Sequence, residues 1–391
     1  MDFLIVPEQE MLVDGVRKIG QSFGLEYWKE KDAKKEFVHE LWNELGKNGY
    51  LGIGIAEEYS GSGLGLLEMA MIIEELAKTG AGSSVGQLFM LTPVFGGITI
   101  ERHGSFQQKS EYLPKIAEGK INFCFALTEP NVGSNSLEIT THAKKNGNQY
   151  IVNGSKTWIS GIDVADKMLI AARTTRLEDV KKKTDGISLF ITDAKHPDAI
   201  TSQMIEKVGT RCIRSDTVFI ENLRVNNENL IGEEGKGWAY LLDSLNAERI
   251  VTTAGLIGTG YLALQLAVDY ANNRNIFHDT PIGAYQGIQF PLARIKAELD
   301  LAQLMNYKAA WLFDHNMPSG KEANMAKLIA AEAAFQATDR AMQTLGGYGY
   351  AKDYHIERLW RDVRLFKIAP VSEEMILNFI AQHDLGLPKS Y

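Results

Sequence analysis

Hydrophobic and polar positions follow three successive patterns along the chain. Over residues 7–117 apolar side chains recur at intervals of three and four positions, which predicts a series of amphipathic helices. Between residues 120 and 232 short alternating runs are separated by turn residues, which predicts strands. Helical spacing then returns. We therefore expect a mainly helical protein with a central β domain, divided at residues 1–119, 120–232 and 233–391.

The central segment carries two dipeptides that favour tight hairpin turns, Asn146-Gly147 and Asn153-Gly154. Apolar runs rich in β-branched and aromatic residues lie on both sides of them, as expected for strands. The pattern predicts a small antiparallel barrel with strands at residues 150–152, 168–171, 187–191 and 217–220.

The stretch from Phe123 to Ser136 combines a strand with a polar turn. Phe123, Phe125 and Leu127 alternate with smaller residues, which predicts a strand with one buried face. Pro130 lacks a backbone donor and Gly133 tolerates unusual dihedral angles, so the chain must leave the sheet and expose N–H groups beside several hydroxyls. Such a turn could hold a large polar cofactor. On these residues alone, an ordinary junction between a strand and a loop is the alternative.

The composition narrows the classes of function. The 391 residues are 45% hydrophobic and 23% charged, enough for a large core. A net charge of −8 argues against a nucleic-acid partner, and the basic run Lys181 to Lys183 is best explained as a solvated loop. Two cysteines are too few for a disulfide framework or a metal cage, so no metal site is predicted. The start of the chain lacks the basic and apolar regions of a secretory signal, and no stretch approaches the length of a membrane span. We expect a cytoplasmic protein with no membrane partner.

A long helix is predicted to follow residue 237. Its apolar stripe, formed by Trp238, Leu241, Leu242 and Leu245, is interrupted by Glu248 and Arg249. An unpaired carboxylate on such a stripe is costly. Helical steps from Glu248 reach Thr252, Gly255 and Thr259, a track of small residues that could form the floor of a ligand site. The alternative is that Glu248 is exposed or forms a salt bridge within a helix bundle.

The turn after Phe125 resembles the flavin-binding signature of the acyl-CoA dehydrogenase family, commonly Ala-Met/Leu-Thr-Glu-Pro-x-Ala-Gly-Ser-Asp. Leu127, Thr128, Glu129, Pro130, Gly133 and Ser134 match it, and Asn135 replaces the Asp. Further similar stretches run to Arg361-Asp362, so the resemblance covers essentially the whole chain. It implies an N-terminal helical domain, a middle antiparallel β-barrel and a C-terminal four-helix bundle.

The resemblance also implies FAD as the cofactor, held within one chain by the Thr128 turn, the segment from Trp158 to Ser160, and Arg274. Trp158 and Ser160 contact the isoalloxazine ring in the family; a tryptophan buried in the barrel is the alternative. Arg274 implies a pyrophosphate contact, for which its planar fork is suited. The run Gln343 to Gly347 implies an adenylate contact from a neighbouring subunit, with helix-terminating glycines as the alternative. The complete set of expected cofactor residues is Phe125, Leu127, Thr128, Gly133, Ser134, Trp158, Ile159, Ser160, Arg274, Phe277, Gln343, Gly346, Gly347, Ser372 and Glu374.

The catalytic base cannot occupy the usual position in this chain. Many family members carry a Glu shortly after the Arg-Asp pair, and that position is Pro370 here, which cannot accept a proton. A minority, which includes the isovaleryl-CoA and long-chain acyl-CoA dehydrogenases, places the base immediately before an arginine on the long helix. The resemblance therefore assigns the base to Glu248, before Arg249. It also implies acyl-CoA contacts from Ser134, Arg249 and Asn246, the last replacing an Asp.

The implied reaction is the α,β-dehydrogenation of an acyl-CoA, or an acyl-carrier thioester, to the trans-2-enoyl thioester. An electron-transfer flavoprotein would be the electron acceptor, and a homotetramer or homodimer the assembly. Because the usual base is absent, two alternatives remain. One is an oxidase, a monooxygenase or a β-substituent-eliminating enzyme on the same fold, and the other is a catalytically silent subunit of a mixed oligomer. The many retained flavin motifs argue against an empty pocket.

Overall fold

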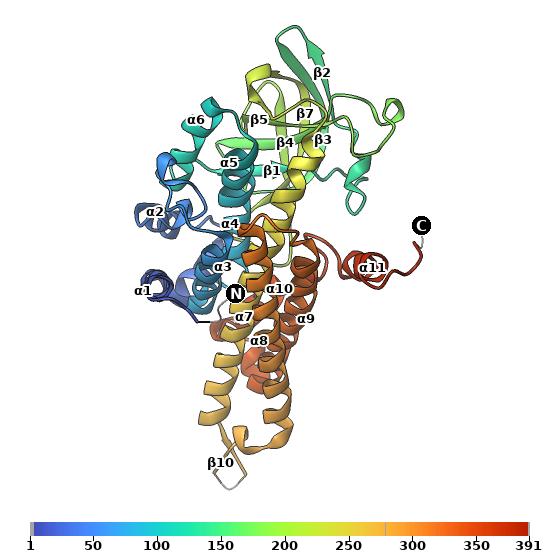
Figure 1. Ribbon diagram of the computed structural model, residues 1–391. Helices are drawn as coiled ribbons and strands as arrows, with labels where there is room; N and C mark the ends of the chain where they lie inside the picture. Colours follow the sequence, from blue (N-terminus) through green and yellow to red (C-terminus); the bar gives the residue numbers. More distant parts are fainter. Residues whose placement is uncertain (1–3, 278, 390–391) are drawn as a thin grey trace.

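The computed structural model describes residues 4–277 and 279–389. Figure 1 shows three parts: a group of helices, a β sheet above and beside it, and a long helical bundle that extends away from the sheet. The expected fold class, mainly helical with a middle β domain, is confirmed.

The first part is built from helices that share one apolar core. Val16 and Trp28 of the first helix lie in that core together with residues of the following helices. The predicted helical region is thus confirmed. Two π-helical segments, Ala77–Ala81 and Met90–Ile98, connect the shorter helices. The helices are α1 (Pro7–Lys34), α2 (His39–Lys47), α3 (Leu66–Leu76), α4 (Ser84–Phe89), α5 (Thr99–His103) and α6 (Phe106–Ala117).

The middle part is a mixed sheet in which the strand order is β6-β7-β3-β2-β4-β5-β8, with β1 paired to β4. The predicted closed barrel is not present among the described residues, because no pairing joins β6 to β8. Pairing is antiparallel except that β4 runs parallel to β1 and pairs in parallel, at its last residue, with the first residue of β2. The strands are β1 (Phe123–Ala126), β2 (His142–Asn146), β3 (Gln149–Ser160), β4 (Lys167–Arg173), β5 (Ile187–Asp193), β6 (Ile200–Met204), β7 (Ser215–Asn226) and β8 (Leu230–Ile231).

Two local predictions for this sheet need correction. Asn146-Gly147 does start the turn between β2 and β3, but Asn153-Gly154 lies inside β3 at a β-bulge. Glycine is required there for another reason: a Cβ on Gly154 would meet the Thr141 side chain at 2.3 Å. Strand β1 is buried on both faces, because the small residues Cys124 and Ala126 are as buried as Phe123.

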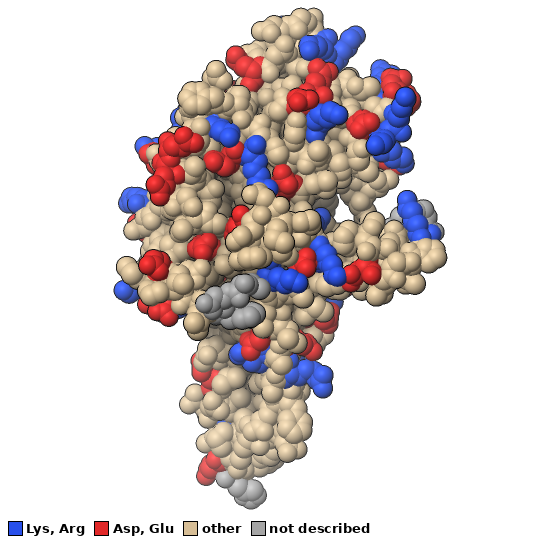
Figure 2. Space-filling view, in the orientation of Figure 1, with Lys and Arg blue, Asp and Glu red and all other residues tan. Residues whose placement is uncertain are grey.

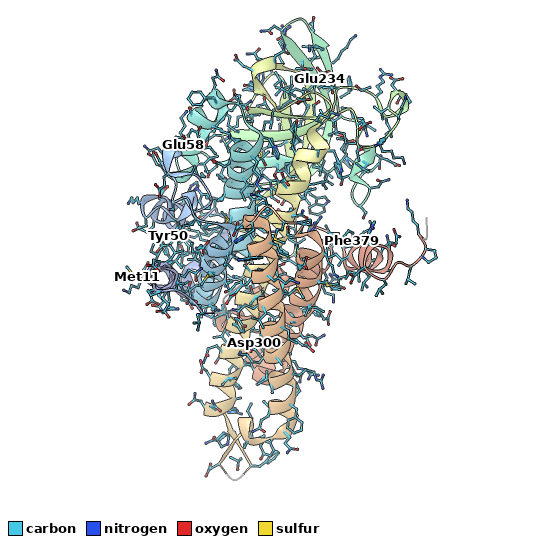
Figure 3. All side chains as sticks on the ribbon, viewed as in Figure 1. Met11, Tyr50, Glu58, Glu234, Asp300 and Phe379 are labelled. Atoms are coloured by element: carbon cyan, nitrogen blue, oxygen red, sulfur yellow. The ribbon has the colours of Figure 1, made fainter. Side chains whose placement is uncertain are left out.

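The third part is a bundle around one long helix, α7 (Gly237–Asn273), packed against α8 (Gln286–Asp314) and α9 (Gly320–Leu345). Polar contacts also cross it: Tyr261 on α7 donates to Asp300 on α8 at 2.7 Å, at the place labelled in Figure 3. The short strands β9 (Asn275–Ile276) and β10 (Thr280–Pro281) lie at the far tip of the bundle. Helix α10 (Ile356–Arg364) packs on α9, and α11 (Glu373–His383) projects to one side.

Helix α7 corrects two expectations. It is long and apolar enough to cross a membrane, although the sequence analysis found no such stretch; 83% of its most apolar window is buried, which identifies it as the core helix of the bundle. The predicted apolar stripe is also incomplete, since Leu241 is buried but Leu242 is 45% exposed.

On the face shown in Figure 2, acidic and basic side chains are interspersed.

Candidate active site

The turn after β1 is anchored by a buried ion pair that the sequence analysis did not assign. The Glu129 carboxylate accepts from Lys156 Nζ at 2.9 Å, and it also accepts from the backbone N–H groups of Thr140 and Thr141. Lys156 is fully buried and donates also to the carbonyl oxygen of Leu127. Glu129 stands in the matched flavin-binding motif, so its place in the sequence was a signal. The pair fixes the turn against strand β3.

The pKa values of this pair follow from burial and charge. Burial raises the pKa of Glu129, but Lys156 and the hydrogen bonds outweigh burial and hold it at about 2. Burial lowers the pKa of Lys156 to about 8, and Glu129 opposes that shift. Both groups are therefore charged at neutral pH, and the pair serves as an anchor.

Trp158 lies two residues beyond this anchor in an unusual conformation. Its φ is +60°, in the left-handed region that bulky residues rarely adopt, and the β3–β7 register shifts between Lys156 and Ile159. Its side chain is 56% exposed, so the alternative of a tryptophan buried in a barrel is wrong. A strained backbone that presents an exposed indole is typical of a binding site.

The other residues expected to contact the flavin ring fall into two groups. Leu127 and Ile159 are buried in the protein core and can contribute only backbone atoms, whereas Gly133 and Ser134 are exposed. Some already have protein partners. Phe125 stacks on Phe95 at a centroid distance of 3.9 Å, the carbonyl oxygen of Thr128 accepts from the N–H of Thr157, and the hydroxyls of Ser160 and Ser215 lie 2.9 Å apart.

Glu248 lies in the buried middle of α7, with 6% of its surface exposed. Among the described residues its carboxylate forms no hydrogen bond or ion pair, so neither alternative, an exposed or a salt-bridged glutamate, applies. Burial raises its pKa to about 8, and the charges of Arg249 and Lys327 oppose that rise only in part. Arg249 instead donates to Asn246 Oδ1 at 2.7 Å. A buried, unpaired carboxylate of this kind is a candidate proton acceptor.

The track of small residues beyond Glu248 does not form a ligand floor along its whole length. Gly255 packs against α4, because a Cβ placed on it would meet Gly86 backbone atoms at 3.3 Å. Thr252 donates to the Glu248 carbonyl oxygen, and Thr259 donates to the Gly255 carbonyl oxygen. The small residues therefore allow two helices to approach closely.

The segment that carries Pro370 is linked to the same part of the bundle through Lys327. This lysine on α9 is fully buried, lies close enough to Glu248 to affect its pKa, and donates to the Val371 carbonyl oxygen at 2.6 Å. Sequence reasoning missed Lys327, which stands without any matched motif. Ser372 caps α11 by accepting from the N–H of Met375, and Glu374 is exposed in the first turn of that helix.

A second group of expected cofactor residues gathers at the tip of the bundle. Arg274, Gly346 and Gly347 line one pocket of about 480 Å³, and Gln343 and Phe277 are exposed nearby in the sequence. The structure does not bring Arg274 to the Thr128 turn of the same chain. Arg274 directly follows α7, about 38 Å along the helix from Glu248 at 1.5 Å per residue. The glycines are not merely helix ends, because they line the pocket with Arg274.

The three-part fold and these two sites define a flavoenzyme class, and comparison with known proteins identifies the family. Models of the N-terminal, middle and C-terminal domains of acyl-CoA dehydrogenase match residues 6–120, 124–223 and 235–385. The chain belongs to the acyl-CoA dehydrogenase family. It is thus an oxidoreductase of a family whose members use FAD.

Individual relatives are similar to this chain, in sequence or in structure, over nearly its whole length. The acyl-CoA dehydrogenase FadE12 of Mycobacterium tuberculosis is 41% identical over 100% of this chain and 99% of its own. The butyryl-CoA dehydrogenase structure from Megasphaera elsdenii has a TM-score of 0.92 at 30% identity and covers 98% of this chain and 100% of its own. The FAD complex of PigA has a TM-score of 0.92 at 25% identity and covers 99% and 100%.

The residues present fit FAD. The turn after Thr128 offers an exposed hydroxyl at Ser134, and Trp158 offers an exposed aromatic face. Arg274 is exposed at a pocket and forms no ion pair within the described part of the chain, so its guanidinium is available for phosphate.

Proposed function

We propose that this protein catalyses the FAD-dependent α,β-dehydrogenation of an acyl-CoA thioester to the trans-2-enoyl thioester, with Glu248 as the base. The observation that carries the proposal is the state of Glu248: buried, unpaired, and with a pKa raised to about 8 by burial. Pro370, at the family's usual base position, has no side chain that can take a proton.

The residues would divide the work as follows. Glu248 takes the α proton, a task that suits a carboxylate whose pKa lies near the working pH. Asn246 and Arg249, on the same helix, contact the thioester substrate. Trp158 and the Thr128 turn orient the flavin ring. FAD, when bound, supplies the hydride acceptor for the β carbon.

The cofactor would be shared between two copies of the chain. One copy contributes the Thr128 turn and Trp158, and the tip of another contributes Arg274, Gln343 and Gly347. The tip of the bundle, where Arg274 follows α7, lies away from the sheet that carries the Thr128 turn and Trp158, and this separation supports the arrangement. The proposed assembly is therefore a homodimer or homotetramer.

The Arg274 assignment is tested by flavin retention. Arg274→Ala should weaken FAD binding about 10- to 100-fold, the equivalent of a charge-assisted hydrogen bond of about 1.5–3 kcal/mol. Dialysis followed by the absorbance ratio of flavin to protein measures the loss. Arg294→Ala, which alters an arginine outside both sites, is the control. Full retention in Arg274→Ala would contradict the assignment.

The base is tested by single-turnover reduction of the FAD-loaded protein without oxygen. Butyryl-CoA, isovaleryl-CoA and palmitoyl-CoA would serve as substrates, and loss of flavin absorbance as the signal. Glu248→Gln keeps the size of the side chain but cannot accept the proton, so the reduction rate should fall on the order of 10² to 10⁴.

Glu373→Gln is the matched control. Glu373 lies close to Pro370 in the sequence, but its carboxylate pairs with Lys367 at 3.1 Å. This variant should reduce its flavin near the parent rate. Loss of reduction in Glu373→Gln alone would move the base there, and parent-rate reduction in Glu248→Gln would overturn the proposal.

The electron acceptor is proposed to be an electron-transfer flavoprotein. If so, the reduced protein should be reoxidised quickly by such a flavoprotein and slowly by air. Rapid oxygen consumption with acyl-CoA would instead identify an oxidase, and protein purified without flavin would favour the silent subunit.

A further inference from the structure

Lys327 occupies an unusual place for a lysine. It is 0% exposed on α9, among the buried small residues Ala323, Ala326, Ala330 and Ala331. Burying an ammonium group there is costly unless it has partners. Its Nζ donates to the Val371 carbonyl oxygen at 2.6 Å, and no carboxylate within the described chain forms an ion pair with it. A hydrogen bond to one neutral carbonyl does not explain why a charged residue is placed in the core.

Val371 belongs to the segment that connects α10 to α11 and that carries Pro370. This segment is attached at two other points: Phe366 is buried in the bundle core, and Lys367 forms an ion pair with Glu332 on α9. Helix α9 thus holds the segment from Lys327 and from Glu332.

Lys327 also provides charge beside Glu248. Two cations act on that carboxylate: Arg249, its neighbour on α7, and Lys327 from α9. The Arg249 guanidinium already donates to Asn246. Burial lowers the pKa of Lys327 to about 8, so it is a cation at neutral pH; the charged groups that act on it are Glu373, Arg249, Glu248 and Lys367. Lys327 is therefore the cation that reaches Glu248 from a different helix.

We propose that Lys327 is a positioning residue for the proton transfer: it attaches the segment around Val371 to α9, and its charge stabilises the ionised carboxylate of Glu248. This inference rests on the proposed function, because it takes Glu248 to be the base. Lys327 touches neither proton nor substrate, and it acts through Glu248.

The test is the pH profile of anaerobic flavin reduction by the same acyl-CoAs in the FAD-loaded protein. The parent rate should rise with pH through the ionisation of the base. Lys327→Met removes the charge at similar length, so the rising limb should move by about one unit toward higher pH, as expected for loss of a nearby opposite charge. The rate at neutral pH should fall about tenfold, while the plateau at high pH stays within a few-fold of the parent.

Lys327→Gln supplies a second comparison should the methionine variant not fold, because it removes the charge and keeps a hydrogen-bond donor. Lys327→Arg keeps the cation and should keep the parent profile. Lys78→Met is the matched control. Lys78 lies in the π-helical segment after α3, pairs with buried Glu74 of α3 at 2.5 Å, and is on neither α7 nor α9. Removal of the Lys78 charge should leave the pH profile unchanged.

The outcomes distinguish the inference on Lys327 from the assignment of Glu248 as the base. If Glu248→Gln abolishes reduction but Lys327→Met and Lys327→Gln keep the parent profile, the inference on Lys327 is overturned and the proposed function stands. A merely structural lysine would lower stability or flavin content without moving the limb. If Glu248→Gln reduces at the parent rate, the base assignment itself fails.

Discussion

Two buried glutamates lie in regions that place opposite demands on a carboxylate. Glu129, in the turn after β1, is 4% exposed and has a pKa held at about 2, whereas Glu248, in the middle of α7, is 6% exposed and has a pKa raised to about 8. The exposed fractions are nearly equal, so exposure to solvent alone does not explain the difference. The decisive feature is pairing: Glu129 has Lys156 and several N–H donors, and Glu248 has none among the described residues.

The comparison indicates how this protein separates an anchor from a reactive group. A carboxylate that accepts several hydrogen bonds and pairs with a cation stabilises the turn, and its lowered pKa keeps it ionised at neutral pH. A carboxylate that is buried without partners is costly to the fold, and this cost is typical of functional groups. The two regions should therefore respond in opposite ways to the same substitution, glutamate to glutamine.

The largest effect is expected on the anchor. Glu129→Gln leaves the Lys156 ammonium buried without a counter-charge, which should destabilise the folded protein by about 3–5 kcal/mol. Thermal and urea denaturation measure this loss, and flavin retention should fall with it because the turn is released. Glu129→Gln combined with Lys156→Met should recover part of the stability. Unchanged stability of the single variant would show that the pair does not hold the turn.

Glu248→Gln is expected to change the stability of the folded protein less than Glu129→Gln does, and in the opposite direction. The folded-state pKa of about 8 lies above the ordinary value of 4.5, so the folded protein binds this proton more tightly than the unfolded chain. Stability therefore falls as pH rises from about 4.5 to about 8. Glutamine removes that loss, and the melting temperature of Glu248→Gln should exceed that of the parent at pH 9 but not at pH 5.

The acid range gives the complementary measurement. Glu129 has a folded-state pKa of about 2, below its ordinary value, so it stabilises the fold above about pH 4.5 and this contribution is lost as pH falls toward 2. The difference between parent and Glu129→Gln should shrink as pH falls toward 2, whereas the difference for Glu248→Gln should grow as pH rises from about 4.5 to about 8. If both differences are independent of pH, pairing does not distinguish the two carboxylates.

Much of this contrast could not be predicted from sequence. Periodicity was sufficient for the helices and most strands, because each buries one face, and family motifs led to Thr128, Trp158 and Glu248. The motifs did not reveal that Glu129 and Lys156 meet, since pairing across 27 positions depends on strand register. Lys327 gave no signal, because a lone lysine among alanines has the same pattern as a solvated helix position.

Two further expectations differ from the structure because a local sequence motif does not specify which elements pack together. The track from Glu248 to Thr259 was interpreted as a ligand floor, but small residues serve equally for close helix packing, and Gly86 of α4 takes that place. Arg274 was expected at the Thr128 turn because the motif gives a cofactor contact without giving its place in the fold. An uninterrupted α7, whose length a sequence pattern leaves open, places Arg274 at the tip of the bundle, away from the sheet that carries the Thr128 turn.

The smallest predicted effect on stability concerns Trp158, which lies two residues beyond Lys156 in a strained conformation. A left-handed φ costs a bulky residue roughly 1–2 kcal/mol, a cost that glycine does not bear. The indole is 56% exposed, so its removal sacrifices little buried area. Trp158→Gly should therefore melt at the parent temperature or gain about 1 kcal/mol, while its flavin dissociates more readily. Trp28, which is 2% exposed in the helical core, is the control, and Trp28→Ala should lose about 3–5 kcal/mol. A large loss of stability in Trp158→Gly would mean that the indole stabilises the fold. The strained conformation beside the Glu129–Lys156 pair would then have a structural role and would not indicate a flavin site.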